Sequence, residues 1–142
     1  QFVAGFIGSP QMNFVDATCK VVGDKVYLVA GPSEIELPPA KAKKLIEGGY
    51  AGKTVVLGIR PEDVHDEQMF ITSSPNTVIQ AKIRVYEMLG AEVYLHFDYE
   101  GATMTARVDS RTTARTGDTV TFAFDAEKIH VFDKETEKTI TN

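Results

Sequence analysis

The chain has 142 residues, of which 43% are hydrophobic and 25% charged, a length and balance typical of one compact domain with a buried core. Its net charge of −5 argues against a nucleic-acid surface, which requires clustered Lys and Arg side chains. The single cysteine, Cys19, excludes an internal disulfide and a thiolate metal site, and we expect it to be buried and unreactive. No apolar run approaches the roughly 18 residues needed to cross a membrane.

The first residues predict the end of a helix. Residues 2–8 carry apolar side chains at helical spacing, and Pro10 ends the pattern. Such a short segment cannot bury its apolar face alone, and the chain does not begin with Met. We therefore interpret residues 1–10 as the tail of a preceding domain and residues 11–142 as the domain itself.

The rest of the chain is mostly β in pattern. Short runs of alternating apolar and polar residues are separated by turn residues such as Gly, Asp and Pro. We expect strands at residues 13–22, 25–30, 34–37, 54–59, 78–89, 91–97, 102–108, 120–124 and 129–132. Within residues 78–89, we expect Ile79, Ala81, Ile83 and Val85 to face the core.

One short helix is predicted at residues 40–47, where Ala, Lys, Leu and Glu dominate. Leu45 and Ile46 would form its apolar edge, while the lysines of its basic cluster are interpreted as a solvated face. This cluster comprises Lys41, Lys43 and Lys44. Residues 72–77 predict a loop between two lobes. Many short strands at close spacing indicate a mainly β fold, an OB-like barrel or sandwich.

Residues 52–54, Gly-Lys-Thr, are similar to the end of a phosphate-binding loop. Such a loop requires a glycine five residues before the second glycine, and Glu47 occupies that position. It also runs from strand to helix, whereas here a predicted helix precedes a predicted strand. We therefore expect no nucleotide binding.

The other chemical motifs are absent. His65, His96 and His130 lack the helical pairing of zinc proteases and are interpreted as structural histidines. No serine lies in a Gly-x-Ser-x-Gly elbow. We predict that the chain is not an enzyme and that it has no catalytic, cofactor-binding or metal-binding residues.

Three loop segments, residues 58–64, 87–92 and 132–136, are candidates for contacts with other domains or subunits. The candidate interface or regulatory residues are Arg60, Pro61, Glu62, Asp63, Glu87, Leu89, Gly90, Phe132 and Asp133. Each segment also has a purely local interpretation. The first would be a turn held by an ion pair between Arg60 and its acidic neighbours, the second a bent strand and the third a hairpin turn.

Together, four segments resemble, in the same order, the region after the nucleotide-binding domain in ATPase subunits of maltose and multiple-sugar importers. They are residues 2–14, 58–64, 87–92 and 130–133. The resemblance implies two OB-like lobes of the transport-associated OB type, built from interleaved segments. It implies a regulatory and dimerisation domain that contacts a second copy of the subunit and its own nucleotide-binding domain. It also implies a place at the inner face of the cell membrane, reached through the membrane subunits, and in some relatives a regulatory protein as partner.

The sequence departs from the whole family protein, since the phosphate loop, glutamine loop, ABC signature and catalytic glutamate are absent. ATP and Mg²⁺ would therefore bind the parent and not this fragment. The alternative function is a small-ligand or oxyanion-sensing OB module. Its Ser-Ala-Arg-Asn type of motif is echoed only in part, at residues 105–107 and 113–115. A third hypothesis for the function, suggested by an OB-like fold alone, is oligonucleotide binding, and the negative net charge argues against it.

Overall fold

The computed structural model describes residues 12–142, so the predicted helix end at residues 2–8 and the domain boundary at residue 10 lie outside the described residues. The described chain forms two antiparallel sheets. The first has the strand order β11-β10-β4-β1-β2-β3. Its strands are β1 (Asn13–Val22), β2 (Lys25–Ala30), β3 (Ser33–Glu36), β4 (Thr54–Ile59), β10 (His130–Asp133) and β11 (Thr139–Thr141).

The second sheet has the order β5-β9-β6-β7-β8. Its strands are β5 (Val64–His65), β6 (Val78–Leu89), β7 (Glu92–Tyr99), β8 (Ala102–Asp109) and β9 (Thr119–Phe124). The bounds of β1, β2, β4 and β6 agree with the predicted strands. The strands β5 and β11 were not predicted, because runs of two and three residues are too short to show a period.

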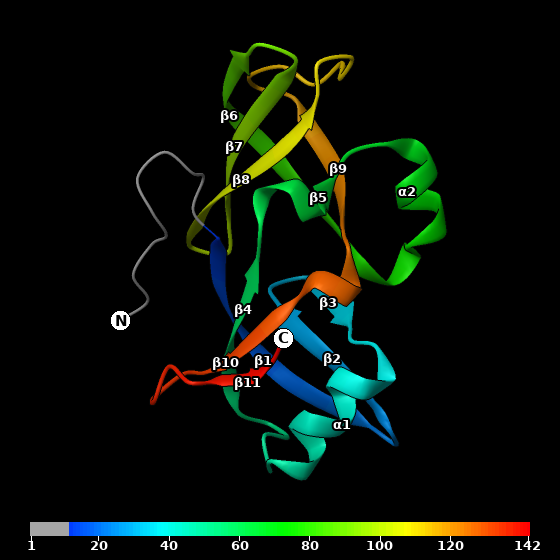
Figure 1. Ribbon diagram of the computed structural model, residues 1–142, viewed down its shortest axis with the longest axis vertical. Coiled ribbons are helices and arrows are strands. Elements are labelled where there is room, and N and C mark those ends of the chain that lie inside the picture. The colour runs from blue at the N-terminus through cyan, green and yellow to red at the C-terminus, as the bar shows by residue number, and fades with distance from the viewer. Residues whose placement is uncertain (1–11) are drawn as a thin grey trace.

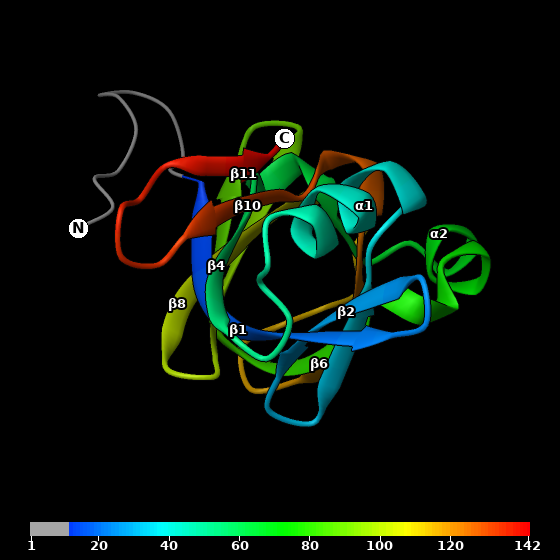
Figure 2. The same ribbon diagram turned by 90° about the horizontal axis from the view of Figure 1, so that it is seen from below.

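The two lobes are interleaved. The chain leaves the first sheet after β4 through the 3₁₀ turn η1 (Pro61–Asp63) and returns after β9 through η3 (Ala126–Lys128). Figure 1 shows the lobes along the long axis of the molecule, and Figure 2 shows the strands curling into a nearly closed barrel. The prediction of a mainly β fold with two interleaved lobes is confirmed.

The prediction of one helix is incomplete. The structure has α1 (Pro39–Glu47) and also α2 (Gln68–Ser73), which is followed by the 3₁₀ turn η2 (Pro75–Thr77). No residue of α2 is buried, so this helix lacks the one-sided apolar pattern by which a helix is recognised. Figure 1 shows α2 at the side of the second lobe, beside β9. Neither helix in residues 12–142 has the length and apolar character needed to cross a lipid bilayer.

The helix α1 turns a different face to the core from the predicted one. Ala42 and Leu45 are buried, whereas Ile46 is exposed. Lys41 is also buried, and its Nζ donates to the carbonyl oxygen of Asn142. Burial lowers the pKa of Lys41. The interpretation of the basic cluster as a solvated face is therefore confirmed for Lys43 and Lys44 but is wrong for Lys41.

Both lobes share one apolar core, which extends from α1 and the first sheet to the inner face of the second. In the second lobe Phe97 and Phe122 stack with ring centroids 4.7 Å apart. Cys19 is fully buried, as predicted, and burial raises the pKa of its thiol.

The strand β6 changes face half-way along its length. Ile79, Ala81 and Ile83 are buried as predicted, but Val85 is 50% exposed. The pairing with β7 shifts its register between Ile83 and Val85, which is the signature of a β-bulge. The extra residue turns Val85 outward and brings Tyr86 against the core. The prediction that Val85 faces the core is therefore wrong.

Candidate functional site

The predicted interface residues lie in three separate places and do not form one site. Residues 60–63 form the first crossing between the lobes, residues 87–90 lie at the β6–β7 turn, and residues 132–133 end β10. In Figure 1 the β6–β7 hairpin and the β10–β11 hairpin lie in different lobes, far from each other.

The first place is the crossing η1, whose shape follows from its proline. Arg60 is extended, with φ −77° and ψ 151°, as expected for a residue that precedes proline. Pro61 is buried and starts the turn, and the Asp63 N–H donates to the Arg60 carbonyl at 2.9 Å. Arg60 itself is exposed. Among the ion pairs of residues 12–142, none joins Arg60 to Glu62 or Asp63, so the local ion-pair interpretation is wrong.

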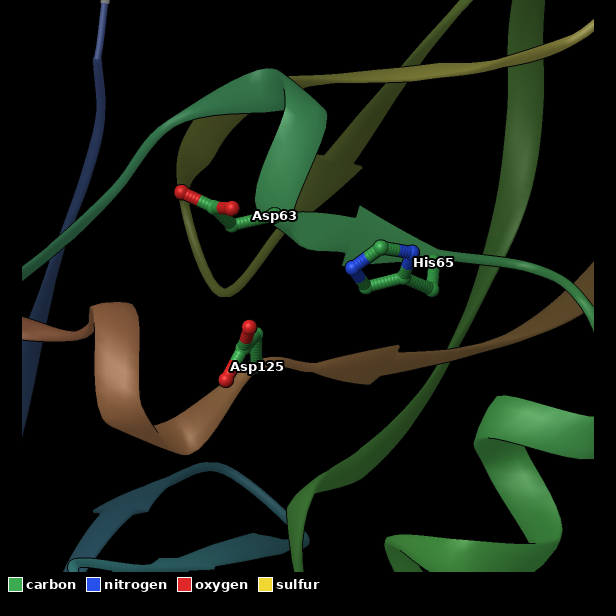
Figure 3. Close-up of side chains that lie close together, drawn as sticks. All are labelled: Asp63, His65 and Asp125. Carbon is green, nitrogen blue, oxygen red and sulfur yellow. The ribbon is translucent and has the colours of Figure 1, made fainter.

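The two crossings meet at a cluster that the sequence did not reveal. Asp63, His65 and Asp125 place ligand atoms within 4.8 Å of one another, and all three are half-buried (Figure 3). The Asp125 N–H donates to the Asp63 carbonyl at 2.9 Å, which fixes the two crossings together. Burial raises the pKa of Asp63, and the charges of Glu62 and Asp125 raise it further. Sequence alone offered no signal, because Asp125 enters the cluster through the pairing of β5 with β9.

The second place is the β6–β7 turn. Gly90 has a φ of +65°, a conformation that glycine adopts without strain. Glu87 pairs with His96 on β7, with Oε1 and Nε2 3.1 Å apart. Met88 and Leu89 are 57% and 48% exposed, and Val85 is also exposed on the β6 half of the hairpin, on the same face as Leu89, whereas Met88 points to the other face. The local interpretation as a bent strand is thus correct, but it does not account for the exposed apolar side chains.

The third place is the end of β10. Phe132 packs edge-on against Phe14, with ring centroids 5.8 Å apart. Asp133 accepts hydrogen bonds from the backbone N–H groups of Glu135 and Thr136, both at 2.9 Å, and from the Tyr50 hydroxyl at 2.7 Å. These contacts hold the turn between β10 and β11. The local interpretation as a hairpin turn therefore explains Asp133.

The same contacts predict a pH-dependent stability. The Thr136 backbone N–H and the Tyr50 hydroxyl lower the pKa of Asp133 from 3.8 to about 2. Since the folded state has the lower pKa, the charged carboxylate stabilises the fold above pH 3.8, and this contribution is lost as the pH falls through about 2. We expect Asp133→Asn to lower the melting temperature near neutral pH, with a difference from wild type that narrows between about pH 4 and about pH 2.

Thermal melts over that pH range measure this difference. Asp24→Asn, at an exposed position in the β1–β2 turn, is the control and should follow the wild type at every pH. A difference for Asp133→Asn that stays constant down to the lowest pH would show that charge is not what stabilises the turn.

Comparisons with known proteins place this arrangement in a family. The family model described as the MalK OB fold domain matches residues 8–64, and the one described as the TOBE domain matches residues 57–132. The chain belongs to the TOBE domain family. The resemblance stated from the sequence is thereby confirmed.

Relatives of this TOBE domain are named as ATP-binding proteins of sugar import. The oligosaccharides import ATP-binding protein MsmX of Bacillus subtilis is 44% identical over 96% of this chain and 36% of its own length. The trehalose/maltose import ATP-binding protein MalK of Thermococcus litoralis is 39% identical over 98% of this chain and 37% of its own length. The multiple sugar-binding transport ATP-binding protein MsmK of Streptococcus mutans is 36% identical over 99% of this chain and 36% of its own length. The chain thus spans little more than a third of the length of these relatives.

A solved structure shares the fold. The cytoplasmic molybdate-binding protein ModG, with molybdate bound, superposes with a TM-score of 0.63 at 14% sequence identity, covering 88% of this chain and 96% of that chain. At this identity the likeness shows the fold alone. Residues 105–107 and 113–115, which match the oxyanion-binding motif only in part, each contain one arginine, and both arginines are engaged within the chain. Arg107 pairs with Glu92 at 3.2 Å, and the Arg115 guanidinium lies 4.6 Å from the centre of the Tyr86 ring.

The Gly-Lys-Thr segment of the TOBE domain has the element order that the sequence predicted. The helix α1 ends at Glu47, and Thr54 begins β4, so Lys53 is followed by a strand and not by the helix that a phosphate-binding loop requires. A depression of about 350 Å³ does lie beside it, lined by Tyr50, Lys53, Thr54, Asp133, Lys134 and Glu135. We expect no binding of ATP at micromolar concentration, measured by isothermal titration calorimetry of the chain. Saturable binding would overturn the interpretation.

Proposed function

We propose that this TOBE domain is the regulatory and dimer-forming part of the ATP-binding subunit of an ABC importer for maltose-type sugars or other oligosaccharides. The observation that carries the proposal is the alignment of nearly the whole chain with a third of each sugar-import relative. ATP and Mg²⁺ then bind elsewhere in the parent subunit, and this domain by itself hydrolyses no ATP. The parent works at the cytoplasmic face of the membrane, held there by the membrane subunits.

The physical role of such a domain is to tether. Two subunits held together by a lasting contact meet at high effective concentration, so ATP does not have to recruit the partner in each cycle. The contact must lie away from the nucleotide-binding faces, which open and close. A β domain with its own core provides a rigid surface for that purpose.

The surface that best fits the contact is the β6–β7 hairpin. Val85, Met88 and Leu89 are exposed there, and Glu87 and Gly90 from the same segment were predicted interface residues. Exposed apolar side chains gathered on one hairpin are typical of a protein contact. We propose a second copy of the subunit as the occupant, because the tether requires two identical domains to meet.

Leu89→Asp in the full-length subunit is expected to weaken dimerisation at least about tenfold, because it buries a charge in an apolar contact. Sedimentation of the subunit without ATP measures the dimer dissociation constant. Val22→Asp is a matched control, since Val22 is also exposed and also precedes a turn glycine, Gly23, with a φ of +64°. The control lies in the other lobe and should leave the dimer unchanged.

Deletion of residues 12–142 from the subunit tests the tether itself. A deleted subunit that dimerises as strongly as the intact one contradicts the role in dimerisation, whatever the effect of Leu89→Asp. If the deletion weakens dimerisation and Leu89→Asp does not, the domain still tethers the two subunits, but the β6–β7 hairpin is not the contact surface.

The oxyanion-sensing alternative has one observation in its favour, the shared fold with a molybdate-binding protein. Against it, both arginines of the partial motifs are engaged within the chain, by Glu92 and by Tyr86. A thermal-shift measurement with molybdate, sulfate and maltose separates the two functions. We expect no rise in melting temperature with any of them, and a saturable rise with molybdate would favour the alternative.

A further inference from the structure

The cluster at the two crossings has a mixed donor set that the proposed function does not use. Asp63 comes from η1, His65 from β5 and Asp125 from the position just before η3, so the three residues belong to both passages of the chain between the lobes. Their ligand atoms lie within 4.8 Å of one another. Figure 3 shows the three side chains around one gap, with one ring nitrogen of His65 and one carboxyl oxygen of Asp125 turned toward it and the Asp63 carboxyl group at its edge.

The imidazole of His65 is held in place by residues outside the cluster. Its Nδ1 lies 3.3 Å from Glu67 Oε2. The ring stacks on Phe70, with centroids 4.0 Å apart and planes at 26°. A histidine that binds a metal through one nitrogen commonly gives the other to a carboxylate, which fixes the orientation of the ring. Glu67 supplies that second contact, while the opposite nitrogen faces the two aspartates.

The fold also brings two like charges together. Asp63 and Asp125 are both half-buried, and their carboxyl oxygens lie within 4.8 Å of each other. A bound divalent cation would neutralise both carboxylates at once.

We propose that Asp63, His65 and Asp125 bind one divalent transition-metal ion, with Zn²⁺ as the reference ion. An imidazole with two carboxylates suits Zn²⁺ and its neighbours in the first transition row, whereas Mg²⁺ and Ca²⁺ prefer oxygen ligands alone. With ligands at about 2.0–2.2 Å from Zn²⁺, tetrahedral donor atoms lie about 3.4 Å apart. Since the ligand atoms lie up to 4.8 Å apart, they must approach one another by up to about 1.4 Å on binding, which rotation of the two carboxyl groups provides.

The position of the ion gives it a structural role. It would join η1 to η3 and so link both crossings, in addition to the backbone bond from Asp125 N–H to the Asp63 carbonyl. Water completes the coordination because the site is only half-buried. The inference concerns the lobe junction and is independent of the proposed dimer surface on the β6–β7 hairpin.

The test uses the 142-residue chain after treatment with a chelator. Calorimetric titration with ZnCl₂ is expected to show one site per chain, and a hundredfold excess over the dissociation constant should raise the melting temperature by about 5–10 °C. MgCl₂ should do neither. Binding of Mg²⁺ as strong as that of Zn²⁺, or no saturable binding of Zn²⁺ at millimolar concentration, would overturn the proposal.

Three variants locate the site. Asp125→Asn and His65→Gln each remove one ligand, and we expect each to weaken Zn²⁺ binding at least about a hundredfold. Glu67→Gln removes only the orienting carboxylate and should cost about tenfold to a hundredfold. Zn²⁺ affinities of the ligand variants equal to that of the wild type would mean that the ion binds elsewhere.

His96→Gln is the matched control. His96 is as exposed as His65, at 29% against 23%, and it also lies beside a carboxylate, Glu87. It should bind Zn²⁺ like the wild type. Circular dichroism of each metal-free variant verifies its fold, and affinity is compared only between variants with the wild-type spectrum. Equal loss in His96→Gln and His65→Gln would also contradict the assignment.

Discussion

Phe122→Ala is expected to lower the free energy of unfolding by about 3–5 kcal/mol. The side chain is fully buried on β9, and its ring stacks on Phe97 with centroids 4.7 Å apart and planes at 15°. Because protein interiors are close-packed, the neighbours cannot fill the space that the lost ring leaves. Such a loss is a large share of the roughly 5–15 kcal/mol that stabilises a typical domain.

Urea denaturation of the purified chain measures this loss. Met69→Ala is the control, because Met69 lies on α2 and is 87% exposed, so its truncation should change the stability by no more than about 0.5 kcal/mol. A cost below about 1 kcal/mol for Phe122→Ala would mean that the second lobe repacks around the cavity.

Local patterns were sufficient to predict most strands. The alternation of residues 13–22 and 25–30, with a glycine between them, gave the bounds of β1 and β2 without error. In such strands one face is buried and the other solvated, so the sequence carries the period of the structure. The interleaving of the lobes had no such local signal. It followed only from the resemblance to importer subunits.

Predictions failed where the answer depends on a distant strand. The bulge in β6 arises from its pairing with β7, so the outward turn of Val85 could not be read from alternation. Lys41 has the composition of a surface residue, yet it is covered because the last residue, Asn142, accepts its hydrogen bond. Tertiary contacts override local preference in both cases.

The candidate site also depends partly on local sequence and partly on the pairing of distant strands. The residues selected from the sequence are a mixture: Leu89 is an exposed apolar residue beside a turn glycine, whereas Pro61 is buried. The sequence did not select His65 or Asp125, which are 60 residues apart and meet Asp63 only through β5–β9 pairing. A two-residue strand such as β5 carries too little pattern to predict its partner.

The second large effect is expected at Asn13, where replacement by alanine should cost about 2–4 kcal/mol. Its side-chain amide donates to the Thr105 carbonyl at 2.9 Å, and the Thr105 N–H donates to its Oδ1 at 2.7 Å. Asn13 begins β1 in the first lobe, and Thr105 lies on β8 in the second. The Asn13 side chain thus forms with β8 the two hydrogen bonds that the backbone of a neighbouring strand would form. Asn13 is only 4% exposed. Alanine leaves both backbone groups of Thr105 without this partner, and each unsatisfied group costs about 1–3 kcal/mol where water is excluded.

Urea denaturation and hydrogen exchange at the Thr105 amide test this expectation. Asn76→Ala is the matched control, because the Asn76 amide also joins the lobes, donating to Glu36 at 2.9 Å, but at an exposed position. Water replaces that bond, so its loss should cost less than about 1 kcal/mol. Equal costs for the two variants would show that water reaches Thr105 once Asn13 is truncated. The lobes would then be held together by the shared apolar core and the two crossings, and the directional hydrogen bonds would only set their orientation.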